Sequence, residues 1–268
     1  MSDRVTIECS DGVADVRLNR PEKHNALDMA LFEALVGAGK RLAGDGSRRA
    51  VVLSGEGPAF CAGIDVSAFS SGDGPSTDTL LELYEGGPAT FAQQAAHTWT
   101  ALPVPVVAAV HGVCFGAGIQ IALAADIRCV APDARLSVME IEWGLIPDVT
   151  GSQTLRHLVR LDVAKELTFT GRIVSGTEAV ELGLATHLSE TPHAAALELA
   201  HEIAGKSPDA IRAGKRLLNT AGVTSLEAGL ALEADLQKGL VGGANQRELV
   251  KAKLEKRPPR FRDPGSAG

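Results

Sequence analysis

The spacing of the hydrophobic residues changes along the chain, and each change predicts a different element. Two apolar runs at 5–7 and 13–18 flank a Ser-Asp-Gly turn, which is the pattern of a β-hairpin. Asp28 precedes a segment whose apolar residues recur every three to four positions, which predicts a helix with Asp28 as its N-cap. Short β-branched runs at 49–55 and 104–110 predict buried strands.

The alternation of strands and helices continues through the first two thirds of the chain. Helices are expected over 79–102 and 119–126, and strands over 127–131 and 134–138. The stretch 67–78 is rich in Ser, Gly and Asp and predicts a loop. This order of elements indicates an α/β core.

From about residue 192 the pattern becomes helical throughout. The segments with helical periodicity are 193–205, 208–221, 225–242 and 244–257. We therefore predict an α/β core over residues 1–191 and a helical region over 192–268. Such an appendage often forms an oligomer interface or covers an active site.

Composition and charge narrow the class of protein. The 268 residues are 45% hydrophobic and 22% charged, as in globular proteins, and the formal net charge is −7. An acidic chain disfavours nucleic acid or an anionic membrane as the main partner. The four cysteines form no CxxC pair, and neither a signal peptide nor a membrane-spanning run is visible. We expect a cytoplasmic protein with buried free thiols.

Several common sites lack their motifs. The seven histidines are scattered without an HExxH motif or a Cys/His cluster, so no metal site is expected. GxGxxG, Walker A and GxSxG motifs are also missing, so dinucleotide, ATP and serine-hydrolase sites have no support.

Two turns of small residues carry the candidate chemistry. The stretches FCAGID (60–65) and HGVCFGAG (111–118) each follow a predicted strand. Such turns can leave a backbone N–H unpaired, and two N–H groups aimed at one point form an oxyanion hole. The alternative is that both are tight turns that need small residues for steric reasons alone.

The order of the motifs resembles the crotonase superfamily, the enoyl-CoA hydratases and isomerases, over residues 5 to 262. The motifs are LNRPEKHNAL (18–27), FCAGID (60–65), HGVCFGAG (111–118), EIEWGLIPD (140–148), LTFTGR (167–172) and LEKRPPRF (254–261). The resemblance implies an α/β fold, a spiral core of stacked ββα units with a C-terminal helical trimerisation domain. It further implies a coenzyme A thioester as substrate, no permanently bound cofactor, no metal, and a homotrimer or dimer of trimers.

The resemblance also implies roles for particular residues. The amides of Ile64 and Ala117 would form the oxyanion hole, and Glu140 would be a catalytic carboxylate. The residues expected to contact the substrate or its CoA are Lys23, Ala26, Ala62, Gly63, Asp65, Val66, Gly118 and Lys256. Lys256 matches a lysine that reaches the CoA of a neighbouring subunit. Lys253 departs from the family pattern, because many relatives have an aromatic residue at that position.

The second acid distinguishes the possible reactions. Hydratases of this family have a second glutamate where this chain has Gln120, and an amide cannot exchange a proton near neutral pH. Asp148 lies eight residues after Glu140, as in the Δ3,5-Δ2,4-dienoyl-CoA isomerase branch, with Gly144 and Pro147 allowing the chain to turn between them. By that resemblance Asp148 removes the proton next to the thioester and Glu140 returns one at the far end.

Other interpretations stay open at this point. Asp148 could instead cap a helix that begins near residue 149. The protein could be a hydratase that uses Glu140 alone or with help from Asp148. A third possibility is a crotonase-fold protein that binds acyl-CoA or RNA without turnover.

Overall fold

A six-stranded sheet lies at the centre of the computed structural model, which describes residues 4–67, 77–85 and 87–264. Its strand order is β1-β2-β3-β4-β6-β9, and all neighbours are parallel except the β1–β2 hairpin. The strands are β1 (Val5–Ser10), β2 (Val13–Leu18), β3 (Ala50–Gly55), β4 (Val106–Val110), β6 (Ile127–Val130) and β9 (His187–Leu188).

A small second sheet continues the spiral beside the first. It consists of β5 (Val113–Phe115), β7 (Arg135–Ser137) and β8 (Val174–Ser175), in the order β5-β7-β8. The hydrophobic pattern did not predict β5, β8 or β9, because runs of two or three residues are too short to show a period.

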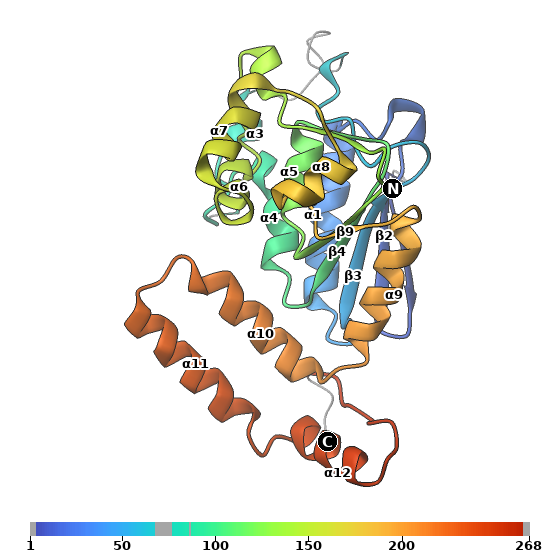
Figure 1. Cartoon of the computed structure of the whole chain (residues 1–268), viewed down its shortest axis with the longest axis vertical. Coiled ribbons are helices and arrows are strands. Elements are labelled where there is room, and N and C mark those ends of the chain that lie inside the picture. Colours follow the sequence, from blue (N-terminus) through green and yellow to red (C-terminus); the bar gives the residue numbers. More distant parts are fainter. Residues whose placement is uncertain (1–3, 68–76, 86, 265–268) are drawn as a thin grey trace.

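Helices cover both faces of the large sheet (Figure 1). Val51 and Leu53 of β3 belong to the hydrophobic cluster shared with α1 (Met29–Gly44), α4 (Phe91–Ala101) and α5 (Ala117–Leu123). Ala50 and Val52 face the other way and join the cluster under α9 (Pro192–Ala204). Both faces of this strand are buried, so its sequence is continuously apolar rather than alternating.

Two predictions at the helix ends have different outcomes. Asp28 caps α1 as predicted, because its side chain accepts a hydrogen bond from the amide of Leu31 at 2.9 Å. The single helix predicted over 79–102 is wrong, since α3 (Thr77–Leu81) and α4 are separate. Pro88 lies between them, and Thr90 forms a capping box with Gln93 that starts α4.

Other short elements were not predicted. They are η1 (Pro21–Lys23), η2 (Glu140–Trp143), α7 (Leu161–Thr170) and α8 (Gly176–Leu182). A helix beginning near residue 149 was one alternative, and α6 (Gly151–Leu158) begins close to that position. Most of the loop predicted over 67–78 falls outside the described residues.

The C-terminal helices were predicted in number and position. After α9 come α10 (Pro208–Ala221), α11 (Leu226–Leu240) and α12 (Ala244–Leu254), which extend away from the sheet (Figure 1). By packing, α9 lies with the core, and the chain leaves the core only at α10. The division at 191/192 into separate domains stays a prediction.

The projecting helices leave apolar side chains in solvent. No residue of α11 is buried, and Leu226 and Leu230 expose 78% and 54% of their surface. None of the helices in the described part of the chain combines the length and apolar character that crossing a bilayer requires.

A buried ion pair attaches α10 to the core. The ammonium group of Lys215 donates to the Asp126 carboxylate at 2.7 Å and to the carbonyl oxygens of Val104 and Trp99 at 3.0 and 3.2 Å. Burial lowers the pKa of Lys215, and the pairing with Asp126 opposes that shift. The same Asp126 carboxylate accepts from the amide of Val106, so one carboxylate connects α10 to the start of β4.

We predict that Lys215→Met lowers the free energy of unfolding by about 3 kcal/mol, because it leaves the Asp126 carboxylate without its cation. Urea denaturation at one fixed protein concentration measures the change. Lys206→Met is the control, since Lys206 forms only an exposed pair with Glu202, and we expect a change within about 0.5 kcal/mol. Equal effects of the two substitutions would contradict the anchoring role of Lys215.

Candidate functional site

The two glycine-containing turns pair with each other. The amide of Cys61 donates to the carbonyl oxygen of Val113 at 3.1 Å, and the amide of Phe115 donates to that of Cys61 at 3.0 Å. A β-carbon built on Gly118 would lie 2.4 Å from the Cys61 carbonyl oxygen, so no larger residue fits there. The small residues thus have a steric reason, and the same close approach brings the two turns together.

The amide of Ile64 is left free by the bonds of its neighbours. The Leu27 amide donates to the carbonyl oxygen of Gly63 at 2.7 Å, and the Asp65 amide donates to that of Leu27 at 3.0 Å. In such a parallel bridge the middle residue turns its own N–H away from the partner chain. Within the described residues the Ile64 N–H accordingly has no acceptor.

The amide of Ala117 is the second unpaired donor. Gly116, with φ of 53°, turns the chain from β5 into α5, and Ala117 is the first residue of that helix. Its N–H has no intrahelical acceptor, and no other acceptor occurs among the described residues. A β-carbon built on Gly63 would lie 3.7 Å from the Ala117 nitrogen, so the two donors belong to touching turns, as an oxyanion hole requires.

Glu140 lies beside this pair of turns. It is the first residue of η2, is 8% exposed, and has its Oε1 atom 3.6 Å from a β-carbon built on Gly116. Its other oxygen, Oε2, is buried without a hydrogen-bond partner among the described residues. Burial raises the pKa of Glu140, and repulsion from Asp148 raises that pKa further.

Gln120 holds Glu140 in place. It is fully buried, and its Nε2 group donates to Oε1 of Glu140. Its Oε1 atom accepts from the amides of Val149 and Gly151, both at 2.8 Å. The sequence marked Gln120 only as a missing acid, because the spacing of the motif does not show which groups its amide contacts.

Asp148 is more exposed than Glu140 but interacts with it electrostatically. Desolvation by the surrounding protein raises the pKa of Asp148. The alternative role as the N-cap of α6 is wrong, since Thr150 occupies that position and the Val149 and Gly151 amides donate to Gln120. Gly144 has φ of 69° and makes the turn expected between the two acids.

A cavity of about 630 Å³ lies beyond Asp148. It is bounded by α4, α6, α7 and the loop before α6, and its walls include Asp148, Thr150, His97, Leu155 and Phe169. Its size is within the range of small-molecule sites. Glu140, Ile64 and Ala117 do not line it, so of the two acids only Asp148 borders this cavity.

The apolar residues between the acids are solvent-exposed in this chain. Trp143, Leu145 and Ile146 expose 60%, 59% and 74% of their surface. Ile146 borders the cavity beyond Asp148, whereas Trp143 and Leu145 are not part of its lining.

The remaining residues predicted to contact the substrate or its CoA do not all lie near the two turns. Ala26 and Ala62 lie in adjoining loops, where the Ala62 amide donates to the carbonyl oxygen of His24 at 2.9 Å, and Lys23 is exposed at the end of η1. Val66 is 43% exposed. Lys256 follows α12, which lies at the bottom of the molecule in Figure 1, away from α5 in the core, so we expect contact with the site only through a second copy.

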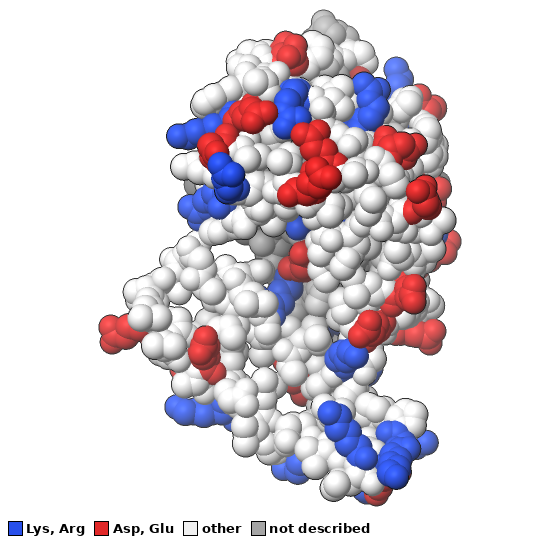
Figure 2. All heavy atoms as spheres, viewed as in Figure 1, with Lys and Arg blue, Asp and Glu red and all other residues white. Residues whose placement is uncertain are grey.

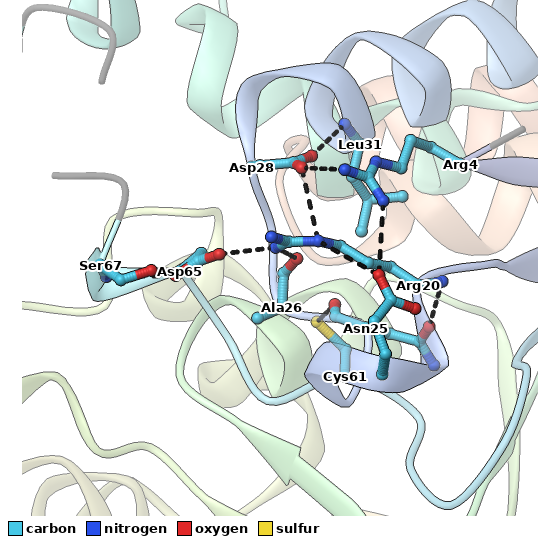
Figure 3. A network of polar contacts seen from close by, with 10 residues as sticks. Arg4, Arg20, Asn25, Ala26, Asp28, Leu31, Cys61, Asp65 and Ser67 are labelled. Atoms are coloured by element: carbon cyan, nitrogen blue, oxygen red, sulfur yellow. Dashed lines mark hydrogen bonds and ion pairs between the residues drawn. The ribbon is translucent and has the colours of Figure 1, made fainter. Parts of the chain in front are cut away.

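The carboxylate of Asp65 is directed into the protein (Figure 3). Hydrogen bonding from Ser67 and pairing with Arg20 lower the pKa of Asp65 to about 2. Both oxygens of this carboxylate are bonded within the protein, so the predicted contact of Asp65 with the substrate stays a prediction. Among the described residues, no group of three or more potential metal ligands occurs.

Comparison with known proteins shows the family of this chain. The family model described as enoyl-CoA hydratase/isomerase matches residues 8–264. A Mycobacterium tuberculosis protein named probable enoyl-CoA hydratase is 36% identical over 259 residues, covering 96% of this chain and 98% of that protein. The mitochondrial methylglutaconyl-CoA hydratase of Homo sapiens is 32% identical over 259 residues, covering 94% and 74%.

Solved structures extend the similarity to the fold. The crystal structure of the enoyl-CoA hydratase from Bacillus anthracis has a TM-score of 0.88 at 29% identity and covers 97% of this chain and 99% of that chain. The match spans both the sheet and the C-terminal helices. The chain therefore belongs to the enoyl-CoA hydratase/isomerase family of the crotonase superfamily, and its fold is the crotonase fold.

Proposed function

We propose that this enzyme shifts double bonds in an enoyl- or dienoyl-CoA by carboxylate proton transfer. The observation that carries the proposal is the state of Gln120, whose amide oxygen and nitrogen are both engaged in holding Glu140 and the 149–151 backbone. An amide in that position cannot act as a second acid. Asp148 is the carboxylate whose charge acts on Glu140, and it borders the cavity that would hold the acyl tail.

The reaction requires one base and one acid around a stabilised enolate. A carboxylate takes a proton from the carbon next to the thioester, and the electron pair moves onto the carbonyl oxygen. The N–H groups of Ile64 and Ala117 would stabilise that oxyanion. The electron pair then returns along the conjugated chain as a second carboxyl group delivers a proton at the far end, so the double bonds move without net gain or loss of atoms.

The placement of the acids supports a direction opposite to the one that the resemblance implies. Glu140 lies beside Gly116, next to the oxyanion-hole residue Ala117. Asp148 borders the cavity farther along. We therefore assign the proton next to the thioester to Glu140 and the distal proton to Asp148.

The substrate is proposed to be an acyl-CoA thioester, with no permanently bound cofactor. Figure 2 shows Lys and Arg side chains gathered at the end of the molecule where Figure 1 places α12. The basic residues of this stretch are Arg247, Lys251, Lys253, Lys256, Arg257, Arg260 and Arg262. Their positive charge suits the phosphates of a CoA bound by a neighbouring copy. The contact of Lys256 with that CoA stays a prediction.

A homotrimer or dimer of trimers is part of the same proposal. The exposed apolar residues of α10 and α11, such as Leu218 and Leu226, and the hollow between α10 and the core need a covering surface. Figure 2 shows the surface hollowed between these helices and the core.

Hydration of a 2-enoyl-CoA is the second candidate function, because the relatives at 36% and 32% identity are named as hydratases. Ultraviolet absorbance separates the two reactions. Hydration removes the conjugation of a 2-enoyl thioester, whereas conversion of a 3,5-diene to a 2,4-diene creates a conjugated thioester.

The two acids should affect different steps of the reaction. In D₂O, Glu140→Gln should slow exchange of the proton next to the thioester of a 3,5-dienoyl-CoA by at least about 100-fold. Asp148→Asn should retain that exchange but lose formation of the 2,4-diene. Mass spectrometry measures the exchange and absorbance the product. Full activity of Asp148→Asn on every enoyl and dienoyl substrate would refute the isomerase proposal.

The second prediction concerns pH. The base must be ionised, and because the pKa of Glu140 is raised, exchange should fall off at a higher pH than an ordinary glutamate with pKa near 4.5 would give. Asp148→Asn removes a repulsion that raises this pKa, so the acid limb of the exchange profile should move to lower pH. An unchanged limb would show that the two carboxylates do not interact.

The third prediction uses Gln120→Met, which keeps the size of the side chain. In the wild type the amide donor of Gln120 lowers the pKa of Glu140. Its loss should therefore move the acid limb of the exchange profile to higher pH, opposite to the effect of Asp148→Asn. The amides of Val149 and Gly151 also lose their acceptor, which should cost about 1 to 3 kcal/mol of unfolding free energy. Exchange profiles and urea denaturation measure both effects. A downward shift of the limb would contradict the hydrogen bond to Glu140.

A further inference from the structure

One guanidinium joins the two loops that flank the Ile64 amide (Figure 3). Nη1 of Arg20 donates to the carbonyl oxygen of Ala26 at 2.8 Å and to the Asp65 carboxylate at 2.7 Å. Ala26 precedes Leu27, and Asp65 follows Ile64, so these contacts lie next to the Leu27–Ile64 bridge. Both side chains are largely buried, at 11% exposure for Arg20 and 9% for Asp65.

Asp65 is held on every side by the protein. Its Oδ1 atom accepts from the hydroxyl and the amide of Ser67 at 2.6 and 3.1 Å, and its Oδ2 atom receives Arg20. Its own amide donates to the carbonyl oxygen of Leu27 at 3.0 Å. A residue with this many bonds leaves its neighbour Ile64 little freedom to rotate.

Arg20 is fixed in turn by the loop that carries it. Asn25, fully buried, accepts from the Arg20 amide at 2.8 Å and donates to the carbonyl oxygens of Ala59 and Glu56 at 2.8 and 2.9 Å. Nε of Arg20 lies 3.4 Å from the Asp28 carboxylate, which also binds Arg4 at 2.7 Å. The loop is thereby tied to the segment that leads into the oxyanion-hole turn.

Two physical effects make this pair important for an oxyanion hole. A preorganised donor must keep its position within a few tenths of an ångström to stabilise charge that develops in the transition state. Without a cation beside it, the Asp65 carboxylate, one residue from the Ile64 amide, would also repel the negative oxygen of the oxyanion. Arg20 supplies both the bracing and the compensating positive charge.

We propose that Arg20 and Asp65 are positioning residues that hold the Ile64 N–H in its catalytic orientation and shield the oxyanion hole from the Asp65 charge. This inference rests on the proposed oxyanion hole. Neither residue needs to contact the substrate through its side chain, since both act through the backbone of residues 63–65.

The test measures the oxyanion hole by binding, separately from turnover. Hexanoyl-CoA has the thioester carbonyl oxygen, and S-hexyl-CoA is the thioether that lacks it. Calorimetry on the full-length protein gives the ratio of the two affinities. We expect the wild type to favour the thioester, and the double variant Arg20→Gln/Asp65→Asn, which leaves no unpaired charge, to lose most of that preference while binding S-hexyl-CoA as before.

Turnover provides the second readout. In the double variant kcat for the preferred unsaturated substrate should fall about 10- to 100-fold with KM changed less than about threefold, as expected when a donor is displaced but the binding surface is kept. Arg20→Lys, which keeps the charge but not the planar fork, should recover part of the loss. Arg4→Gln is the matched control, because Arg4 binds Asp28 in the same network without touching Asp65.

The outcomes separate the two levels of the proposal. A wild type that binds both ligands equally would overturn the oxyanion hole and this inference with it. A wild type that discriminates, with variants at Arg20 and Asp65 that discriminate equally well, would overturn only the positioning role. If Arg4→Gln reduces the ratio as much as the double variant, the effect is general loosening and the inference also fails.

Discussion

The site depends on the pairing of the turn at 60–65 with β5. Two backbone hydrogen bonds between Cys61 and the strand at 113–115 bring together chain segments that are about fifty residues apart, in a contact so close that glycine is required at 118. The amides of Ile64 and Ala117, which have no acceptor among the described residues, belong to the two segments that this contact joins, and Glu140 lies against Gly116.

The carboxylates are governed by opposing electrostatic effects. Burial and the charge of Asp148 raise the pKa of Glu140, while the Gln120 amide stabilises its ionised form. Two interacting acids do not both ionise easily, which is the electrostatic basis of the proposed pairing of a base with an acid. Gln120 cannot transfer a proton near neutral pH, and it supplies a fixed hydrogen-bond donor to Glu140.

Ion pairs fix two segments of the chain, one next to the Ile64 amide and one in the C-terminal helices. Lys215 and Asp126 secure α10, and Arg20 and Asp65 secure the loop after η1. Such pairs are costly to bury, and their geometry is correspondingly specific. Although α11 packs against α10, none of its residues is buried in the described chain, which is the physical basis for expecting a second copy against it.

The sequence alone predicts the alternation of strands and helices, the cap at Asp28 and the four C-terminal helices. These features are local, since they follow from hydrophobic period, capping chemistry and short motifs. It misjudged the break before α4, where Pro88 and the Thr90 capping box outweigh the periodicity, and it missed β5, β8 and β9, which exist only through pairing.

The contacts of individual side chains follow only from the folded structure. Gln120 holds Glu140 through its amide group, and the carboxylate of Asp65 pairs with Arg20. Asp148 does not cap α6, because the amides of Val149 and Gly151 donate their hydrogen bonds to Gln120 instead. None of these contacts can be predicted from spacing along the chain, because each joins residues from different elements whose separation is set only when the turns and the sheet pack together.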